Sequence, residues 1–173
     1  QFAEKAGSDA LLVVTPYYNK PTQEGLYQHY KKINDSVGIP IIIYNIPSRS
    51  VIDMSVDTMA KLYELKIIKG VKDATGDLNR VDQQLKAMGK EFIQLTGNDD
   101  NAFEFNKRGG VGAIGVTANV AAKLSSDFQN ACTQNISKAS ELDKLLQPLH
   151  SSLFIESNPS PVKYAASLLG MCK

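Results

Sequence analysis

A lysine at the end of an apolar run is the first feature of this sequence that suggests chemistry. Residues 67–71 (IIKGV) lead into Lys72, and residues 73–76 (DATG) have the composition of a turn. A strand of this kind delivers its terminal amine to the edge of a sheet, where burial disfavours the charged form. A neutral lysine amine attacks ketones to form a Schiff base. The position also suits a lysine that simply reaches solvent, as Lys66 and Lys69 would, so both interpretations stay open at this point.

Two further candidates follow the preceding apolar run, residues 40–45 (PIIIYN). Tyr44 lies near the end of that run, and a phenol beside a nucleophilic amine can shuttle protons. Arg49 follows in a turn, where its planar guanidinium suits a carboxylate. Considered alone, Tyr44 is better explained as a tyrosine packed at a strand end with its hydroxyl in water, and only its place beside Lys72 and before Arg49 favours the functional role. Most surface arginines do not bind a substrate carboxylate, and we interpret Arg80 and Arg108 as surface arginines of that kind.

No pattern in the sequence predicts a metal or a nucleotide cofactor. His29 and His150 lack acidic or cysteine partners at ligand spacing, and we interpret both as surface residues. The pair Asp99-Asp100 follows Gly97-Asn98 and is best explained as a helix N-terminus that favours negative charge. Neither a GxGxxG motif nor a P-loop occurs, which weighs against a nucleotide-binding sheet.

Length, charge and cysteine content narrow the class of protein. A chain of 173 residues can form one domain with a substantial core. Its net charge of +1, with both signs mixed along the chain, argues against nucleic acid or an anionic membrane as a partner. Cys132 and Cys172 stand far apart, which argues against a disulfide framework and predicts a cytoplasmic location. The sequence opens without Met, inside what resembles a helix end, so we expect it to be part of a longer protein.

One unit repeats five times and must position these residues. Apolar runs cover residues 9–15, 40–45, 67–72, 91–96 and 112–117. Amphipathic helices are predicted over about 22–37, 55–65, 78–88 and 121–135, with another ending near residue 108. This alternation predicts βαβ units and a parallel sheet covered on both faces. Polar, glycine-rich and aromatic residues gather after the strands, which predicts a site at the C-terminal edge of the sheet.

Doubly wound sheets and (β/α)8 barrels both carry their sites at that edge. Two further helices, over about 137–154 and 160–171, suit a barrel with a helical C-terminal appendage. Five units cannot close a barrel of eight strands. Either the sheet is open with five strands, or three βα units precede Gln1.

The strand-end motifs resemble, in order, those of the dihydrodipicolinate synthase family. They are TPYYN (15–19), YNIPSR (44–49), GVKDATG (70–76), TGND (96–99) and VTANV (116–120), and NPSPVK (158–163) is similar to the family's C-terminal helical motif. The resemblance implies an α/β fold of the (β/α)8 TIM-barrel class. Residues 1–135 would form strands four to eight, and residues 136–173 the start of an incomplete helical C-terminal region. It also implies that three βα units are missing and that this chain alone is inactive.

The resemblance further implies an enzyme that needs no cofactor. Members of the family condense pyruvate with L-aspartate 4-semialdehyde through a lysine Schiff base, on the route to diaminopimelate and lysine. Lys72 would be the nucleophile, and Tyr44 would belong to a proton relay. Tyr18 would enter the relay of a neighbouring subunit in a homo-oligomer, a dimer or a dimer of dimers, although its position alone favours an exposed loop aromatic. Arg49 would hold the carboxylate of the semialdehyde.

Other positions are implied to shape the pocket. Gly97 and Ile114 match residues that line the pyruvate site, although either equally suits barrel packing. Gly70 lies two residues before Lys72 on the same face and would leave room for the lysine stem. Of the lysine-binding residues in regulated members, only Tyr17 matches a position retained here.

Three hypotheses about function remain open. The first is the synthase. The second is another pyruvate-dependent Schiff-base aldolase, an N-acetylneuraminate or 2-keto-3-deoxy sugar-acid lyase, which needs hydroxyl-binding groups for a polyol tail. The third is a non-catalytic barrel that binds a 2-oxo acid or serves as an assembly subunit. Arg49, directly after Ile46-Pro47-Ser48, favours a short acidic aldehyde and therefore the synthase.

Overall fold

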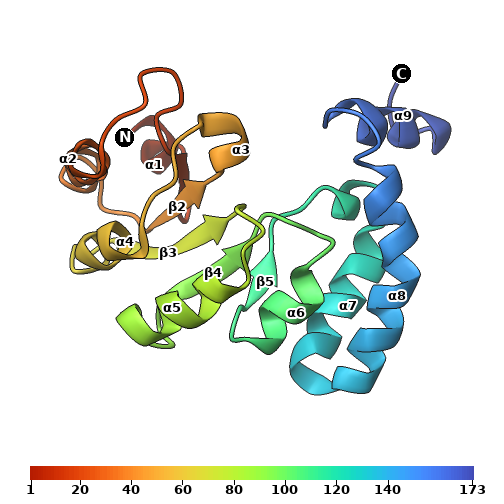
Figure 1. Ribbon diagram of the computed structural model, residues 1–173. Coiled ribbons are helices and arrows are strands. Elements are labelled where there is room, and N and C mark those ends of the chain that lie inside the picture. The colour runs from red at the N-terminus through yellow and green to blue at the C-terminus, as the bar shows by residue number, and fades with distance from the viewer.

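The computed structural model describes residues 1–173, and five parallel strands form its centre (Figure 1). They are β1 (Leu11–Val14), β2 (Ile41–Asn45), β3 (Ile68–Asp73), β4 (Ile93–Thr96) and β5 (Gly112–Ala113). Each strand pairs with the next one along the chain, so the order is β1-β2-β3-β4-β5. A doubly wound sheet reverses its strand order at a switch point, and a barrel does not. The order therefore agrees with the predicted barrel wall and excludes the doubly wound alternative.

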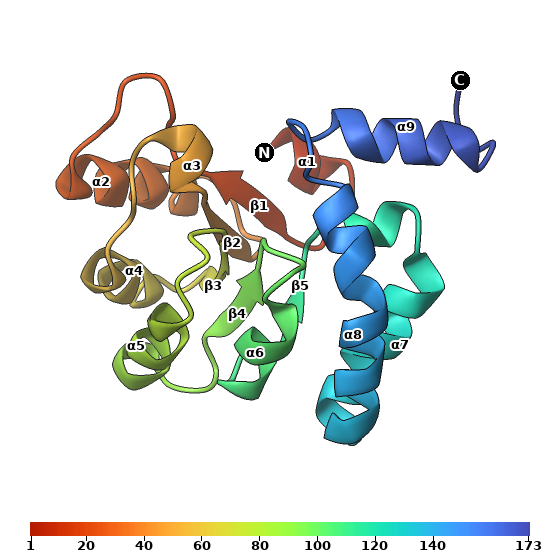
Figure 2. The same ribbon diagram turned by 45° about the vertical axis from the view of Figure 1, so that its right-hand side comes forward.

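Helices follow the strands in turn. The main ones are α2 (Gln23–Asn34), α4 (Val56–Tyr63), α5 (Asn79–Met88), α6 (Ala102–Lys107), α7 (Ala122–Gln134), α8 (Ile136–Ser152) and α9 (Ser160–Leu168). Three short turns complete the set: α1 (Phe2–Lys5), α3 (Pro47–Ser50) and the 3-10 helix η1 (Thr117–Asn119). Figure 2 shows α7 beside α8, with α9 extending across one end. The predicted elements all form, but β5 is shorter than the run 112–117, and neither α3 nor η1 was predicted.

Side-chain caps explain where several helices begin. Thr22 accepts a hydrogen bond from the Gly25 N–H at 3.2 Å, and Ser55 accepts one from the Thr58 N–H at 3.1 Å. Asn135 separates α7 from α8, because its side-chain oxygen accepts from the Lys138 N–H at 3.0 Å. Such caps satisfy backbone donors that have no partner inside the helix.

Helices cover only the outer face of the sheet, so the prediction of cover on both faces is wrong. The outward residues Ile41, Ile43 and Val71 are fully buried in a core shared with α2 and α4. Side chains alternate along a strand, and the inward residues Leu12 and Val14 remain 45% and 37% exposed. A barrel buries its second face against the interior side chains of its own strands. The strands of a barrel and those of a doubly wound sheet therefore have the same apolar sequence pattern.

A second core joins the later helices. Buried side chains from α6, α7 and α8 pack together there, namely Ala102, Phe128, Ala131, Ala139, Leu142 and Leu146. This core holds the C-terminal helices beside β5, next to the carboxyl ends of the strands (Figure 1). None of the helices combines the length and apolar character needed to cross a membrane.

Candidate active site

Lys72 and Tyr44 occupy matching positions on neighbouring strands. The register pairs Tyr44 of β2 with Lys72 of β3, so both side chains emerge on the inner face at the same height. The Lys72 amine lies over the Tyr44 ring, 4.0 Å from its centroid. Lys72 is only 9% exposed. The structure therefore places the two residues predicted as nucleophile and proton shuttle in direct contact.

No carboxylate pairs with Lys72, although a carboxylate follows it in the chain. The ion pairs of this chain involve other cations, and the Lys72 amine has no hydrogen-bond partner. Asp73 points to the opposite face because strand side chains alternate. On its own face Lys72 has Tyr44 and Leu95 as register neighbours. Its amine is therefore available to a small ligand.

Gly97, and not Gly70, leaves room for the lysine stem. A Cβ atom on Gly97 would lie 3.1 Å from Cε of Lys72 and 2.6 Å from Cβ of Ala74. A Cβ on Gly70 would lie 2.2 Å from the carbonyl oxygen of Ile93. Gly70 thus permits the close approach of β4, and the role predicted for it is wrong. The space beside Lys72 is set by the neighbouring strand rather than by its own.

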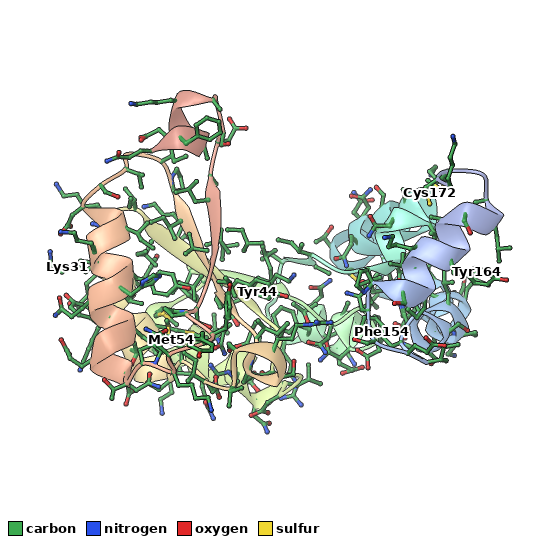
Figure 3. The ribbon with its side chains drawn as sticks, turned by 90° about the horizontal axis from the view of Figure 1, so that it is seen from above. Lys31, Tyr44, Met54, Phe154, Tyr164 and Cys172 are labelled. Carbon is green, nitrogen blue, oxygen red and sulfur yellow. The ribbon has the colours of Figure 1, made fainter.

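A cleft of about 920 Å³ opens at the carboxyl ends of the strands. Its lining includes five of the predicted site residues, namely Tyr44, Arg49, Lys72, Gly97 and Ile114. The volume lies in the range of small-molecule sites. In Figure 3, Tyr44 lies between the helix-covered side of the sheet, marked by Met54, and the C-terminal region, marked by Phe154 just after α8 and by Tyr164 of α9.

Arg49 lies at the rim of this cleft, on the short helix α3. Its Nη2 donates a hydrogen bond to the carbonyl oxygen of Asn158 at 2.9 Å, which joins α3 to the segment before α9. Its other guanidinium N–H groups have no partner within the chain. The side chain is thus held in place while most of its donors remain available to a ligand.

Tyr17 and Tyr18 lie away from the lysine. They are 65% and 91% exposed, and neither borders the main cleft. Tyr17 lines a second, more apolar hollow of about 480 Å³ together with Leu12 and Val14, and Tyr44 and Arg49 border both this hollow and the main cleft. Within one chain, the structure does not bring Tyr17 or Tyr18 to Lys72.

Arg80 is buried, so its prediction as a surface residue is wrong. It is 9% exposed and its Nε donates to Oδ2 of Asp73 at 2.9 Å. Gln84, one helical turn further along α5, donates to the same oxygen at 2.9 Å. The signal was the spacing of four between two polar side chains, which places both on one face of α5. Arg108 is exposed as predicted and pairs with Asp82 at 2.7 Å.

His150 is also buried, contrary to prediction. It is 4% exposed, it borders the cleft, and its Nδ1 lies 2.7 Å from Oγ1 of the fully buried Thr117. Its Nε2 has no partner in the chain. Leu142 and Leu146 precede it at intervals of four on the buried face of α8, and that periodicity was the available signal. His29 is half-buried, and this burial lowers the pKa of its imidazole.

Asp99, the first residue of the acidic pair after β4, binds a helix other than α6, which the pair directly precedes. Asp99 accepts hydrogen bonds from the N–H groups of Val116 and Thr117, at 2.6 and 3.0 Å, and so binds the start of η1 rather than that of α6. A Cβ on Gly115 would lie only 1.7 Å from Oδ1 of Asp99, so a glycine is needed there. No group of three or more His, Cys, Asp and Glu side chains is placed to hold a metal ion.

Sequence comparison relates the whole chain to one family. The model of the dihydrodipicolinate synthetase family matches residues 1–173. A 4-hydroxy-tetrahydrodipicolinate synthase of Pelagibacter ubique is 76% identical over 174 residues, which cover 98% of this chain and 59% of that protein. The synthase of Bradyrhizobium diazoefficiens is 63% identical over 171 residues, which cover 98% of this chain and 58% of that protein. The chain thus spans about three fifths of the length of these relatives.

Solved structures give the same relationship. The dihydrodipicolinate synthase of Aquifex aeolicus matches with a TM-score of 0.96 at 43% identity, over 99% of this chain and 59% of that one. The synthase of Acinetobacter baumannii, crystallised with pyruvate, matches with a TM-score of 0.95 at 44% identity and the same coverage. The five strands and their helices therefore have the fold of the corresponding part of these enzymes.

Proposed function

The chain belongs to the dihydrodipicolinate synthetase family, and on this premise we propose that the protein carrying it is a 4-hydroxy-tetrahydrodipicolinate synthase. It would condense pyruvate with L-aspartate 4-semialdehyde in the cytoplasm, on the route to diaminopimelate and lysine. The observation that carries the proposal is the unpaired, buried amine of Lys72 against Tyr44 at the base of the cleft. The pyruvate complex of the Acinetobacter baumannii relative supports the choice of the first substrate.

Lys72 would form the covalent bond to pyruvate. Its amine attacks the keto carbon to give a carbinolamine, which loses water and becomes the imine. Loss of a methyl proton then gives an enamine, whose carbon attacks the aldehyde carbon of the second substrate. The amino group of that substrate finally displaces the lysine amine, which closes the ring and restores the enzyme.

Tyr44 would move the protons that these steps require. Carbinolamine dehydration needs a proton delivered to the leaving hydroxyl, and a phenol beside the amine can deliver and recover it. Tyr18, whose side chain is 91% exposed, would complete the relay of a second copy of the protein. We therefore propose that the working form is a homo-oligomer, either a dimer or a dimer of dimers.

Arg49 would recognise the second substrate. The guanidinium donors not used by Asn158 can bind a carboxylate at the rim of the cleft. Gly97 and Ile114 would border pyruvate, because both line the cleft with Lys72. Tyr17 would contact an inhibitory lysine in a regulated enzyme. No step of this scheme needs a cofactor.

A trapping experiment tests the nucleophile. Residues 1–173 would replace the matching 59% of the Pelagibacter ubique relative, which gives a chimera of full length. Pyruvate with borohydride should add a reduced adduct to Lys72, visible by peptide mass spectrometry. Lys72→Ala should abolish the adduct, whereas Lys69→Ala, an exposed lysine of the same strand, should keep it. An adduct on another lysine, or none in an active chimera, would contradict the assignment.

The same chimera tests the second substrate. We expect turnover with L-aspartate 4-semialdehyde and none with a sugar aldehyde of the kind used by sialic-acid lyases. The reverse preference would assign the protein to the sugar-acid lyases.

Residues 1–173 alone should be inactive, because β1 and β5 leave unpaired backbone groups at both edges of the sheet.

A further inference from the structure

We propose that Arg80 is a positioning residue for the Schiff-base reaction, because it joins the two strands that carry Lys72 and Tyr44. The inference rests on the proposed function, and its observations come from the opposite face of the sheet. Arg80 does not contact the substrate in this proposal. It acts through Asp73 and through Asp53.

Each residue of the reacting pair is followed by a buried polar residue that points outward. Asn45 follows Tyr44 and is fully buried, and Asp73 follows Lys72 and is 5% exposed. The register pairs Asn45 with Asp73, directly behind the reacting pair. Anything that fixes Asn45 and Asp73 therefore fixes the backbone of Tyr44 and Lys72.

The carboxylate of Asp73 is fully occupied. Its Oδ1 accepts from the N–H and the hydroxyl of Thr75, at 3.0 and 2.7 Å. Its Oδ2 accepts from Nε of Arg80 and from the amide of Gln84, both at 2.9 Å. Four donors hold one carboxylate, which has about four lone-pair sites when ionised. The end of β3 has little freedom to move while these bonds persist.

Arg80 extends this network to β2. Its Nη2 donates to the carbonyl of Met54 at 2.7 Å, and its Nη1 lies 3.4 Å from Oδ2 of Asp53. Asn45 holds the same two residues, because it donates to Oδ1 of Asp53 at 2.7 Å and accepts from the Met54 N–H at 3.0 Å. One guanidinium thus bonds to the Asp73 carboxylate and to both partners of Asn45.

Arginine is suited to this task by its shape. Its planar fork presents five donors in fixed directions, whereas a lysine offers a single point charge. A buried ion pair is weak evidence for stability, since well-packed apolar residues often stabilise a site equally well. A shift of about 1 Å between reacting groups, by contrast, lowers a rate by roughly 10²-fold. Placing the reacting pair is therefore a sufficient reason for burying this charge.

The test compares two arginines in the chimera. Arg80→Leu should lower the single-turnover rate of pyruvate adduct formation at Lys72 by roughly 10–100-fold. The pyruvate concentration for half-maximal rate should change by less than about threefold, because Arg80 does not contact the substrate. Arg108→Leu, which removes an exposed arginine paired with Asp82, should leave both quantities unchanged. The rate of adduct formation in Arg80→Lys should lie between the rates of wild type and Arg80→Leu.

A stability control separates positioning from general destabilisation. Leu26→Ala removes a fully buried side chain of α2 that lies outside the network, and it should lower the unfolding midpoint without slowing the adduct. Each variant is assayed well below its own unfolding midpoint. An Arg80→Leu protein that forms the adduct at the wild-type rate would overturn the inference. A loss of adduct rate in Leu26→Ala equal to that in Arg80→Leu would overturn it too. A wild-type chimera that forms no adduct would instead overturn the proposed function itself.

Discussion

The two faces of the sheet treat consecutive charged residues in opposite ways. On the outer face, Asp73 receives four hydrogen bonds, two of them from Arg80 and Gln84. On the inner face, the Lys72 amine has no carboxylate partner and lies over the aromatic ring of Tyr44. A buried charge normally finds partners, because leaving it unpaired is costly. The outer face follows that rule, which fixes the end of β3, and the inner face departs from it where chemistry is proposed.

Strand β2 repeats the contrast over three residues. Ile43 and Asn45 lie on the outer face of the sheet and are fully buried there. Tyr44, which lies between them in the sequence, is on the inner face and lines the cleft. Outward residues complete a core and a polar network, and the inward residue completes neither. A change in the apolar core of the outer face should therefore lower stability, and a change at the inward residue should lower activity.

The largest effect is expected from an inward change. In the chimera, Tyr44→Phe should lower kcat by roughly 10²–10⁴-fold, the usual contribution of a placed acid–base group. The free energy of unfolding should change by no more than about 0.5 kcal/mol, because the hydroxyl has no partner in the fold. Steady-state kinetics and urea unfolding measure both. Unchanged turnover, or a loss explained by unfolding, would break the contrast between the faces.

An outward change at the neighbouring position should have the opposite signature. Ile43→Ala should lower the free energy of unfolding by about 2–5 kcal/mol, because it leaves a cavity in the core. The adduct rate per folded molecule should change by less than about threefold. Ile155→Ala, at a site 78% exposed, serves as the matched control and should cost about 0.5 kcal/mol or less. A slowed adduct with intact stability in Ile43→Ala would contradict the separation.

A smaller effect is expected where the inner face is crowded. Gly97→Ala places a methyl group 3.1 Å from Cε of Lys72 and 2.6 Å from Cβ of Ala74, so a neighbour must shift. We expect adduct formation to slow by roughly tenfold, in line with the cost of modest overpacking. Adding Ala74→Gly relieves only the second contact. If that double variant regained the full rate, the lysine stem would not be what Gly97 accommodates.

Local sequence pattern was sufficient for the elements and for much of the site. Apolar runs ending in Tyr44-Asn45 and in Lys72 became strands, and parallel strands bring their carboxyl ends to one edge. That is why Arg49 was expected at the same edge as Lys72, and it borders the cleft. Gly97 and Ile114 border the cleft as well, but only the family resemblance placed them there in advance. The strands and the position of Arg49 depend on residues close in the chain, where period and turn composition carry the information.

The tertiary structure alone decided which polar groups are buried and with whom. Arg80 bonds to Met54, 26 positions away, and His150 bonds to Thr117, 33 positions away. Residue 70 is a glycine because the backbone of β4 passes close to it. Helices cover only one face of the sheet because the other face lines the inside of the curved row of strands. Such contacts join segments whose separation no local period encodes. Burial and pairing follow from the packed arrangement of distant strands and helices, and the residue type by itself leaves both undetermined.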